Sequence, residues 1–199
     1  PVTLVAEAVF ARVLSALKDQ RVAAADALAG PDRGIDGDRS DIISDSHDAL
    51  YGSKIVSYAH GFMLLRAAAA QYGWNLDYGG IAYLWREGCI IRSVLLEHIK
   101  AAFDRSPDIA SLVIDDYFRG ELEKAQPGWR RTVVRAVEAG IPVPAFSAAL
   151  AFYEGYRTCR VPANLIQAQR DYFGAHTYER VDRPRGETFH TEWLEADHG

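Results

Sequence analysis

The sequence is poor in sulfur, with two Cys and one Met among its 199 residues. Cys89 and Cys159 lie far apart and outside any CxxC spacing, which argues against a zinc site and a disulfide framework and predicts buried free thiols. No apolar run approaches the ~20 residues that a membrane helix needs, and the N-terminus lacks the pattern of a signal peptide. We therefore expect a soluble, cytoplasmic protein without a membrane partner.

The sequence also lacks an excess of positive charge. Its formal net charge is −5, so no basic face is available for a nucleic-acid backbone, and nucleic acid is excluded as a partner. Neither a GxGxxG turn nor a Walker A sequence is present, and the YGG at 78–80 is a much weaker signal. The chain by itself therefore has no recognisable nucleotide site. With 49% hydrophobic and 25% charged residues, it can bury the core of one domain.

Apolar residues recur at helical spacing through most of the chain. A polar stretch rich in Gly and Asp, residues 30–46, reads as a surface loop that ends in a helix N-cap at Asp45 or Ser46. Only residues 187–194 look extended, and no second strand is evident. The fold class is therefore all-α. The expected helices cover 2–28, about 47–71, a long segment that includes 91–103, then 108–125, 128–139, 145–158 and 162–172.

Several polar residues are candidates for chemistry on account of their type. Asp115 and Asp116 are adjacent on a helix and point in different directions, so a solvated helix end is expected instead of a carboxylate pair. Three histidines lack evident ligand partners and are expected at the surface or in satisfied, partly buried positions: His47, His60 and His98. No metal site is expected.

Two arginines, Arg12 and Arg92, lie inside apolar runs that read as helices. A guanidinium is costly in such a place unless an acid or a bound anion pairs with it. An internal ion pair and a bound anion therefore both remain open for each of them.

A short stretch near the C-terminus, LIQAQRDYFGAHTYER at 165–180, combines Arg170 and His176 with several aromatic residues. Gly174 lies between the two and is expected to end a helix. The pattern indicates a helix end that presents two cationic groups, for which a bound anion is the natural ligand.

Long blocks of this chain closely resemble the C-terminal half of the 6-phosphogluconate dehydrogenase family. The resemblance runs from Pro1 to the segment FHTEW near the end of the chain. It implies an all-helical domain of that family's C-terminal type, partly present here as residues 1–180, followed by an extended tail at 181–199. The blocks are AVFAR, ALYGSKIVSYAHGFMLLR, WNLDYGGIAYLWREGCIIRS, AGIPVPAFSAALAFYEGYR and PANLIQAQRDYFGAHTYER.

The resemblance also implies an activity. Members of this family carry out the NADP-dependent oxidative decarboxylation of 6-phosphogluconate to ribulose 5-phosphate in the pentose phosphate pathway, without a metal. They act as homodimers whose tail enters the other subunit. By the family pattern, Arg12 contacts the substrate phosphate within its own subunit, and Arg170 and His176 reach the same phosphate from the partner subunit.

The family's NADP fingerprint, its other substrate motifs, its catalytic lysine and its acid glutamate all belong upstream of Pro1. We therefore expect no catalytic residue in this chain, with NADP bound mainly by the absent N-terminal domain, and no turnover by this chain alone. The chain also starts directly in a helical pattern without Met, and we expect it to be cut from a longer one. The alternative reading is a separated helical module that self-associates and has no catalytic activity.

Overall fold

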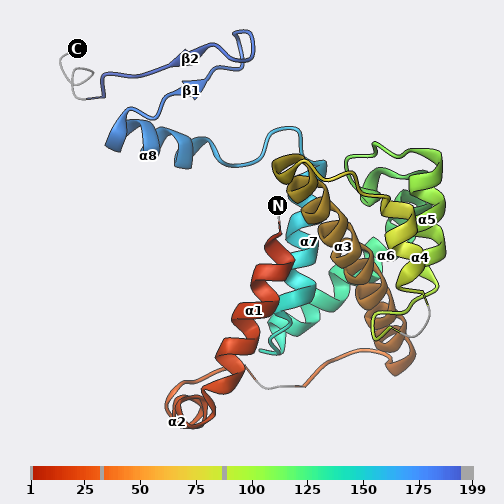
Figure 1. The fold of residues 1–199 in the computed structure, drawn as a ribbon. Coiled ribbons are helices and arrows are strands. Elements are labelled where there is room, and N and C mark those ends of the chain that lie inside the picture. Colours follow the sequence, from red (N-terminus) through yellow and green to blue (C-terminus); the bar gives the residue numbers. More distant parts are fainter. Residues whose placement is uncertain (1, 32–33, 87–88, 194–199) are drawn as a thin grey trace. The chain divides into compact units, whose positions relative to one another are not determined.

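The computed structural model describes residues 2–31, 34–86 and 89–193, and their regular structure is almost entirely helical (Figure 1). The all-α class expected from the sequence is confirmed. Two compact units divide the chain, residues 1–154 and residues 155–199. The elements are α1 (Thr3–Ala16), α2 (Lys18–Ala27), α3 (Arg39–Tyr72), α4 (Tyr78–Leu84), α5 (Leu95–Arg105), the 3-10 helix η1 (Leu112–Ile114), α6 (Asp116–Glu138), α7 (Pro144–Arg157), α8 (Asn164–Gly174), β1 (Tyr178–Glu179) and β2 (Thr188–Phe189).

The core of the first unit lies where the long helix α3 packs along α6. Ile55 of α3 and Phe118 and Trp129 of α6 are almost completely buried there. Trp129 donates its indole N–H to the carbonyl of Phe146, 3.2 Å away. Gly52 faces the same indole so closely that a Cβ built on it would lie 2.7 Å from Cε3 of Trp129. The two helices thus approach each other at a glycine, and their separation is fixed by a buried tryptophan.

The polar stretch before α3 is shorter than the sequence predicts. Helix α3 begins at Arg39, and Asp38 caps it by accepting a hydrogen bond of 2.7 Å from the backbone N–H of Ser40. The expected N-cap at Asp45 or Ser46 is wrong, because Asp45 is buried inside the helix and binds Arg131 of α6 through two bonds of 2.6 and 2.9 Å. Arg135 donates to the same carboxylate. These bonds, led by that from Arg131, outweigh burial and lower the pKa of Asp45.

The N-terminal segment is divided into two helices where one was expected. The break falls at Leu17, between α1 and α2. One turn earlier the Ser15 hydroxyl donates to the carbonyl of Arg12 at 2.7 Å, and Arg21 donates to the carbonyl of Ser15 at 3.1 Å. Side-chain bonds of this kind compete with the backbone ladder and favour an interruption.

The expected long helix through 91–103 is also wrong in its first part. The structure has the short helix α4, then a segment without regular helix, and α5 only from Leu95. The YGG at 78–80 begins α4, whose first turn is capped by Asp77 through the N–H of Gly80 at 2.9 Å. Arg92 therefore lies exposed in a connecting segment and not inside an apolar helix. Tyr58 of α3 holds that segment by donating to the carbonyl of Ile91 at 2.5 Å.

Residues 116–138 form the single helix α6, although the sequence suggested two shorter helices on either side of Pro127. Proline removes one backbone hydrogen bond, but the buried apolar face of α6 continues on both sides of it through Leu122 and Trp129, and tertiary packing dominates helix stability. The expected solvated end at 115–116 is wrong for Asp115, which is buried, caps α6 and pairs with Arg105 at 2.7 Å.

The second unit contains α8 and a short antiparallel hairpin. The expected helices at 145–158 and 162–172 are confirmed as α7 and α8, each within two residues at either end. The extended stretch at 187–193 has a partner after all, because Phe189 pairs with Tyr178 and Thr188 with Glu179. Residue 194, the last of that predicted stretch, lies outside the described residues.

Two further expectations on single residues need correction. Cys159 is exposed and Cys89 is half-buried, so neither unpaired thiol lies in the core. His60 is completely buried against the ring of Phe152, and neither of its ring nitrogens has a hydrogen-bond partner among the described residues. Burial lowers its pKa and keeps it neutral. In the described part of the chain, no helix has both the length and the apolar character that crossing a membrane would require.

Candidate functional site

Helix α8 carries Arg170 on an exposed position one turn before Gly174. Residues four apart share one face of a helix. The imidazole of His176 lies against that last turn, so close that a Cβ built on Gly174 would be 3.1 Å from its Nε2. Arg170 and His176 are thereby brought to the same side of the helix end, and both side chains are exposed. Two exposed donors at one helix end can bind an anion.

A sharp turn after α8 sets the position of His176. Its two neighbours both have left-handed backbone conformations, with φ of 48° at Ala175 and 59° at Thr177. Such values are uncommon for residues with a side chain and persist where surrounding contacts impose them. The contacts here come from α8 itself: Gln167 donates to the carbonyl of Thr177 at 2.5 Å, and the N–H of Thr177 donates to Oδ1 of Asp171 at 3.0 Å.

The carboxylate of Asp171 is the most heavily bonded acceptor of the second unit. It is fully buried, and it also accepts from Nδ1 of His190 at 3.0 Å, from the N–H of Thr191 at 3.1 Å and from the indole N–H of Trp193 at 3.0 Å. Burial alone would raise its pKa, but these hydrogen bonds, led by that of His190, lower it to about 2.

Sequence reasoning passed over Asp171, although it stands directly beside Arg170. Its one signal is an acid inside the aromatic stretch DYF, where a carboxylate needs partners. The partners follow it by 6 to 22 residues, beyond the reach of any helical spacing rule.

Arg12, the third predicted residue, belongs to the first unit. It is exposed on α1 and lines a groove of about 730 Å³ between α1, α3 and the start of α7. No ion pair joins its guanidinium to any residue that the structure describes, so an internal pair does not account for it. The apolar side chains of the groove include Leu4, Val5, Val9, Val13, Leu50 and Phe146.

The same groove holds polar groups that the sequence did not single out. Lys54 of α3 is a second cation, and Ser53 and Ser57 lie on the same helix. The hydroxyl of Ser53 is buried without a hydrogen-bond partner among the described residues. A guanidinium, an ammonium and free hydroxyls suit an oxyanion. The spacing of residues 53, 54 and 57 in one helix is compatible with a common groove-facing side. The sequence alone does not show that this side lies opposite Arg12.

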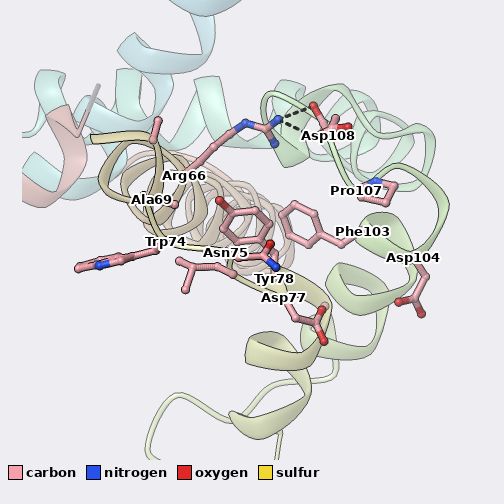
Figure 2. Close-up of a pocket in the computed structure, with 13 residues that line it drawn as sticks. Arg66, Ala69, Trp74, Asn75, Asp77, Tyr78, Phe103, Asp104, Pro107 and Asp108 are labelled. Atoms are coloured by element: carbon pink, nitrogen blue, oxygen red, sulfur yellow. Dashed lines mark hydrogen bonds and ion pairs between the residues drawn. The ribbon is translucent and has the colours of Figure 1, made fainter. Parts of the chain in front are cut away.

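A second hollow, of about 670 Å³, lies beside the end of α3 and is drawn in Figure 2. Arg66 reaches across it and donates to the carbonyls of Asp108 and Ile109, at 2.8 Å each. The carboxylates that line it have partners as well, since Asp77 caps α4 and Asp104 pairs with Lys100 at 2.5 Å. None of the three predicted residues lines this hollow. Its charged groups already hold the fold together, which makes it the weaker candidate.

In the part of the chain that the structure describes, no three acidic, histidine or cysteine side chains are grouped so that they could hold a metal ion. The structure describes Arg12 in one unit and the pair Arg170 and His176 in the other. Two separate sets of cationic groups, each suited to an anion, are therefore the chemistry that this chain offers.

Comparison with known proteins identifies the family to which the chain belongs. The family model of the 6-phosphogluconate dehydrogenase C-terminal domain matches residues 1–193. The chain belongs to the 6-phosphogluconate dehydrogenase family. It is 58% identical over 194 residues to the decarboxylating 6-phosphogluconate dehydrogenase of Homo sapiens and 53% identical over 193 residues to that of Aggregatibacter actinomycetemcomitans.

Each of these comparisons covers 97% of this chain but only 40% of the relative. The chain thus spans about two fifths of the length of the curated relatives that it matches. Among solved structures, 6-phosphogluconate dehydrogenase from Plasmodium falciparum superimposes with a TM-score of 0.90 at 38% identity, covering 97% of this chain and 41% of that one. That protein was determined in its apo form, with its cofactor NADP+ and with its substrate 6-phosphogluconate.

Proposed function

We propose that this chain is the C-terminal part of an NADP-dependent 6-phosphogluconate dehydrogenase, in which it supplies contacts to the substrate phosphate and the interface of a homodimer. The complete enzyme then converts 6-phosphogluconate to ribulose 5-phosphate and CO₂. The observation that carries the proposal is that an exposed His176 packs against the last turn of α8 at Gly174, one turn after the exposed Arg170. Residues 1–180 form the substrate-binding and dimerisation part, and 181–199 the tail.

A phosphate dianion has the chemistry that these residues recognise. Arginine offers a planar fork of donors that matches two phosphate oxygens, and its charge persists at every physiological pH. Histidine adds a donor whose charge depends on pH near neutrality. Arg12 supplies the guanidinium of one subunit, in a groove with a second cation, Lys54. Arg170 and His176 supply the other half from the partner subunit.

The surface of α1 supports an interface with other protein segments. Four of its apolar side chains are more than half exposed, namely Val9 at 55%, Phe10 at 64%, Val13 at 59% and Leu14 at 58%. A contiguous apolar surface of this kind is typical of interaction sites. The same observation favours the second candidate function, which is a helical module that only self-associates. Such a module would bind no substrate, and it would not explain why Arg170 and His176 are exposed at one helix end.

The residues that the structure describes do not fit a dinucleotide. Binding of the NADP pyrophosphate normally requires a glycine-rich turn between a strand and a helix, whereas the described strands form only the two-residue ladder of a hairpin. We therefore assign NADP to the part of the enzyme that this chain does not contain. The same holds for the base that takes the substrate's hydroxyl proton and the acid that protonates the enediol intermediate.

The test is the substitution Arg170→Ala in the complete enzyme that carries this chain. A hydrogen bond to a charged group contributes about 1.5–3 kcal/mol, so the KM for 6-phosphogluconate should rise by about one to two powers of ten. The KM for NADP should stay unchanged. Arg119→Ala is the matched control, because Arg119 is exposed on α6 and, within the described part of the chain, forms an ion pair only with the nearby Asp116. Equal rises in both KM values would contradict a role in phosphate binding.

A further inference from the structure

Asp171 stands beside Arg170 in the chain but points away from the anion-binding side. Its carboxylate is fully buried, whereas Arg170 and His176 are exposed. Residues adjacent on a helix are rotated by about 100° from each other, so Asp171 cannot share the face of Arg170. It is therefore placed to act on the site through the chain around it and not by contact with a ligand.

The four groups around this carboxylate all donate to it. Oδ1 accepts from the N–H of Thr177 and from His190, and Oδ2 accepts from the N–H of Thr191 and the indole of Trp193. The side chain of Asp171 thus binds both the turn directly after α8 and the segment 190–193 that follows β2. An asparagine has a single oxygen, and its NH₂ group would meet two donors on the other side.

Thr177 transmits this hold to His176. Its N–H is bound by Asp171 and its carbonyl by Gln167, so both backbone polar atoms of the residue after His176 are bound to α8. Because the backbone on both sides of His176 is left-handed, the ring is directed back onto Gly174 and toward the face of Arg170. Without these bonds the turn would relax, and the imidazole would leave that face.

We propose that Asp171 is a positioning residue, which holds His176 beside Arg170 by binding the turn at Thr177 and the returning segment 190–193. This inference rests on the proposed function of the Arg170 and His176 pair. Formation of the phosphate-binding arrangement then requires that the segment after the hairpin be docked on α8. The chain's last described residues thereby support the site through Asp171.

The experiment substitutes Asp171→Asn in the complete enzyme and measures kcat and both KM values. We expect the KM for 6-phosphogluconate to rise at least tenfold, while kcat and the KM for NADP stay within twofold of the parent. Amide exchange of residues 176–193 should rise in the same protein, because the four donors lose their common acceptor. Asp182→Asn is the matched control, since it removes an acid of the same unit whose ion-pair partner among the described residues is Arg180 of the hairpin loop.

A milder variant, Gln167→Ala, decides the matter if Asp171→Asn does not fold. It removes the other bond to Thr177 and leaves the Asp171 carboxylate with all four of its donors, and it should raise the KM for 6-phosphogluconate severalfold and selectively. An unchanged KM in both variants would overturn the inference, as would a parallel loss of kcat and of NADP binding, which indicates a general role in folding. Arg170→Ala, measured in the same experiment, separates a failure of the proposed function from a failure of this inference. If it leaves the KM unchanged, the proposed function and this inference fall together; if it alone raises the KM, only the inference falls.

Discussion

The close approach of α3 and α6 at Gly52 leads to a quantitative prediction for Gly52→Ala. The new methyl group would lie 2.7 Å from Cε3 and 3.0 Å from Cζ3 of Trp129. The indole is fully buried and bonded to the carbonyl of Phe146, so it has little room to move. Inserting a methyl group into such a core costs about 1–3 kcal/mol.

Alanine also has an intrinsic advantage over glycine inside a helix, of about 1 kcal/mol. The two effects oppose each other, and the steric one is larger, so we expect Gly52→Ala to lower the free energy of unfolding by up to about 2 kcal/mol. Gly61→Ala is the matched control in the same helix, because a Cβ built there meets no atom within 4 Å. That variant should gain up to about 1 kcal/mol.

The assay is urea-induced unfolding followed by the far-ultraviolet circular dichroism of the helices, with both variants and the parent measured together. The difference between the two variants cancels the helix preference and isolates the steric cost, expected at about 1–3 kcal/mol. If Gly52→Ala were as stable as Gly61→Ala, the contact between Gly52 and Trp129 would not limit how closely the helices pack.

Three further predictions concern single contacts. Asp45→Ala should lower the free energy of unfolding by about 1.5–3 kcal/mol, because it removes the buried acceptor that two partly exposed arginines of α6 share; chemical denaturation measures this, and an unchanged stability would contradict the contact. The hydrogen bond to Asp171 raises the pKa of His190. The stability that this bond contributes is therefore complete below the ordinary pKa of histidine and is lost as pH rises through the raised value. The protection factors of the amides at 190–193, which correct for the base-catalysed intrinsic exchange rate, should be higher near pH ~6 than near pH ~8, and equal or lower protection at the lower pH would refute the assignment. Gly174→Ala should raise the KM for 6-phosphogluconate severalfold without changing that for NADP, because the added Cβ meets the ring of His176 at 3.1 Å; an unchanged KM would show that the ring does not need this position.

Local sequence signals predicted those elements whose ends are set by their own residues. Helix α8 ends at Gly174, and α3 is followed by Gly73 with a left-handed φ of 68°, as a glycine after a helical stripe indicates. The start of α3 was missed because Asp45 resembles a cap, while its partners Arg131 and Arg135 lie in a helix far along the chain. A long-range ion pair leaves no local pattern.

The same distinction holds for the candidate site. Arg170 and His176 stand out because two cations flank a glycine, and Arg12 because a charge interrupts an apolar run. Asp171 gives no such signal, since its meaning depends on donors contributed after the hairpin. The fold class could be read from periodicity, whereas the hairpin could not, because two-residue strands are too short to show alternation.

The proposal that one site draws on two subunits can be tested most directly by mixing two variants of the complete enzyme that each bind 6-phosphogluconate poorly. Subunits with Arg12→Ala are combined with subunits carrying Arg170→Ala, by co-expression or by refolding together. In a hybrid dimer one site then carries both substitutions and the other carries neither. Random assortment should restore roughly a quarter of the parent's activity at low concentrations of 6-phosphogluconate, through sites with the parent's KM. If Arg12 and Arg170 act within the same subunit, every site stays defective, and the mixture would be no more active than the two variants measured separately.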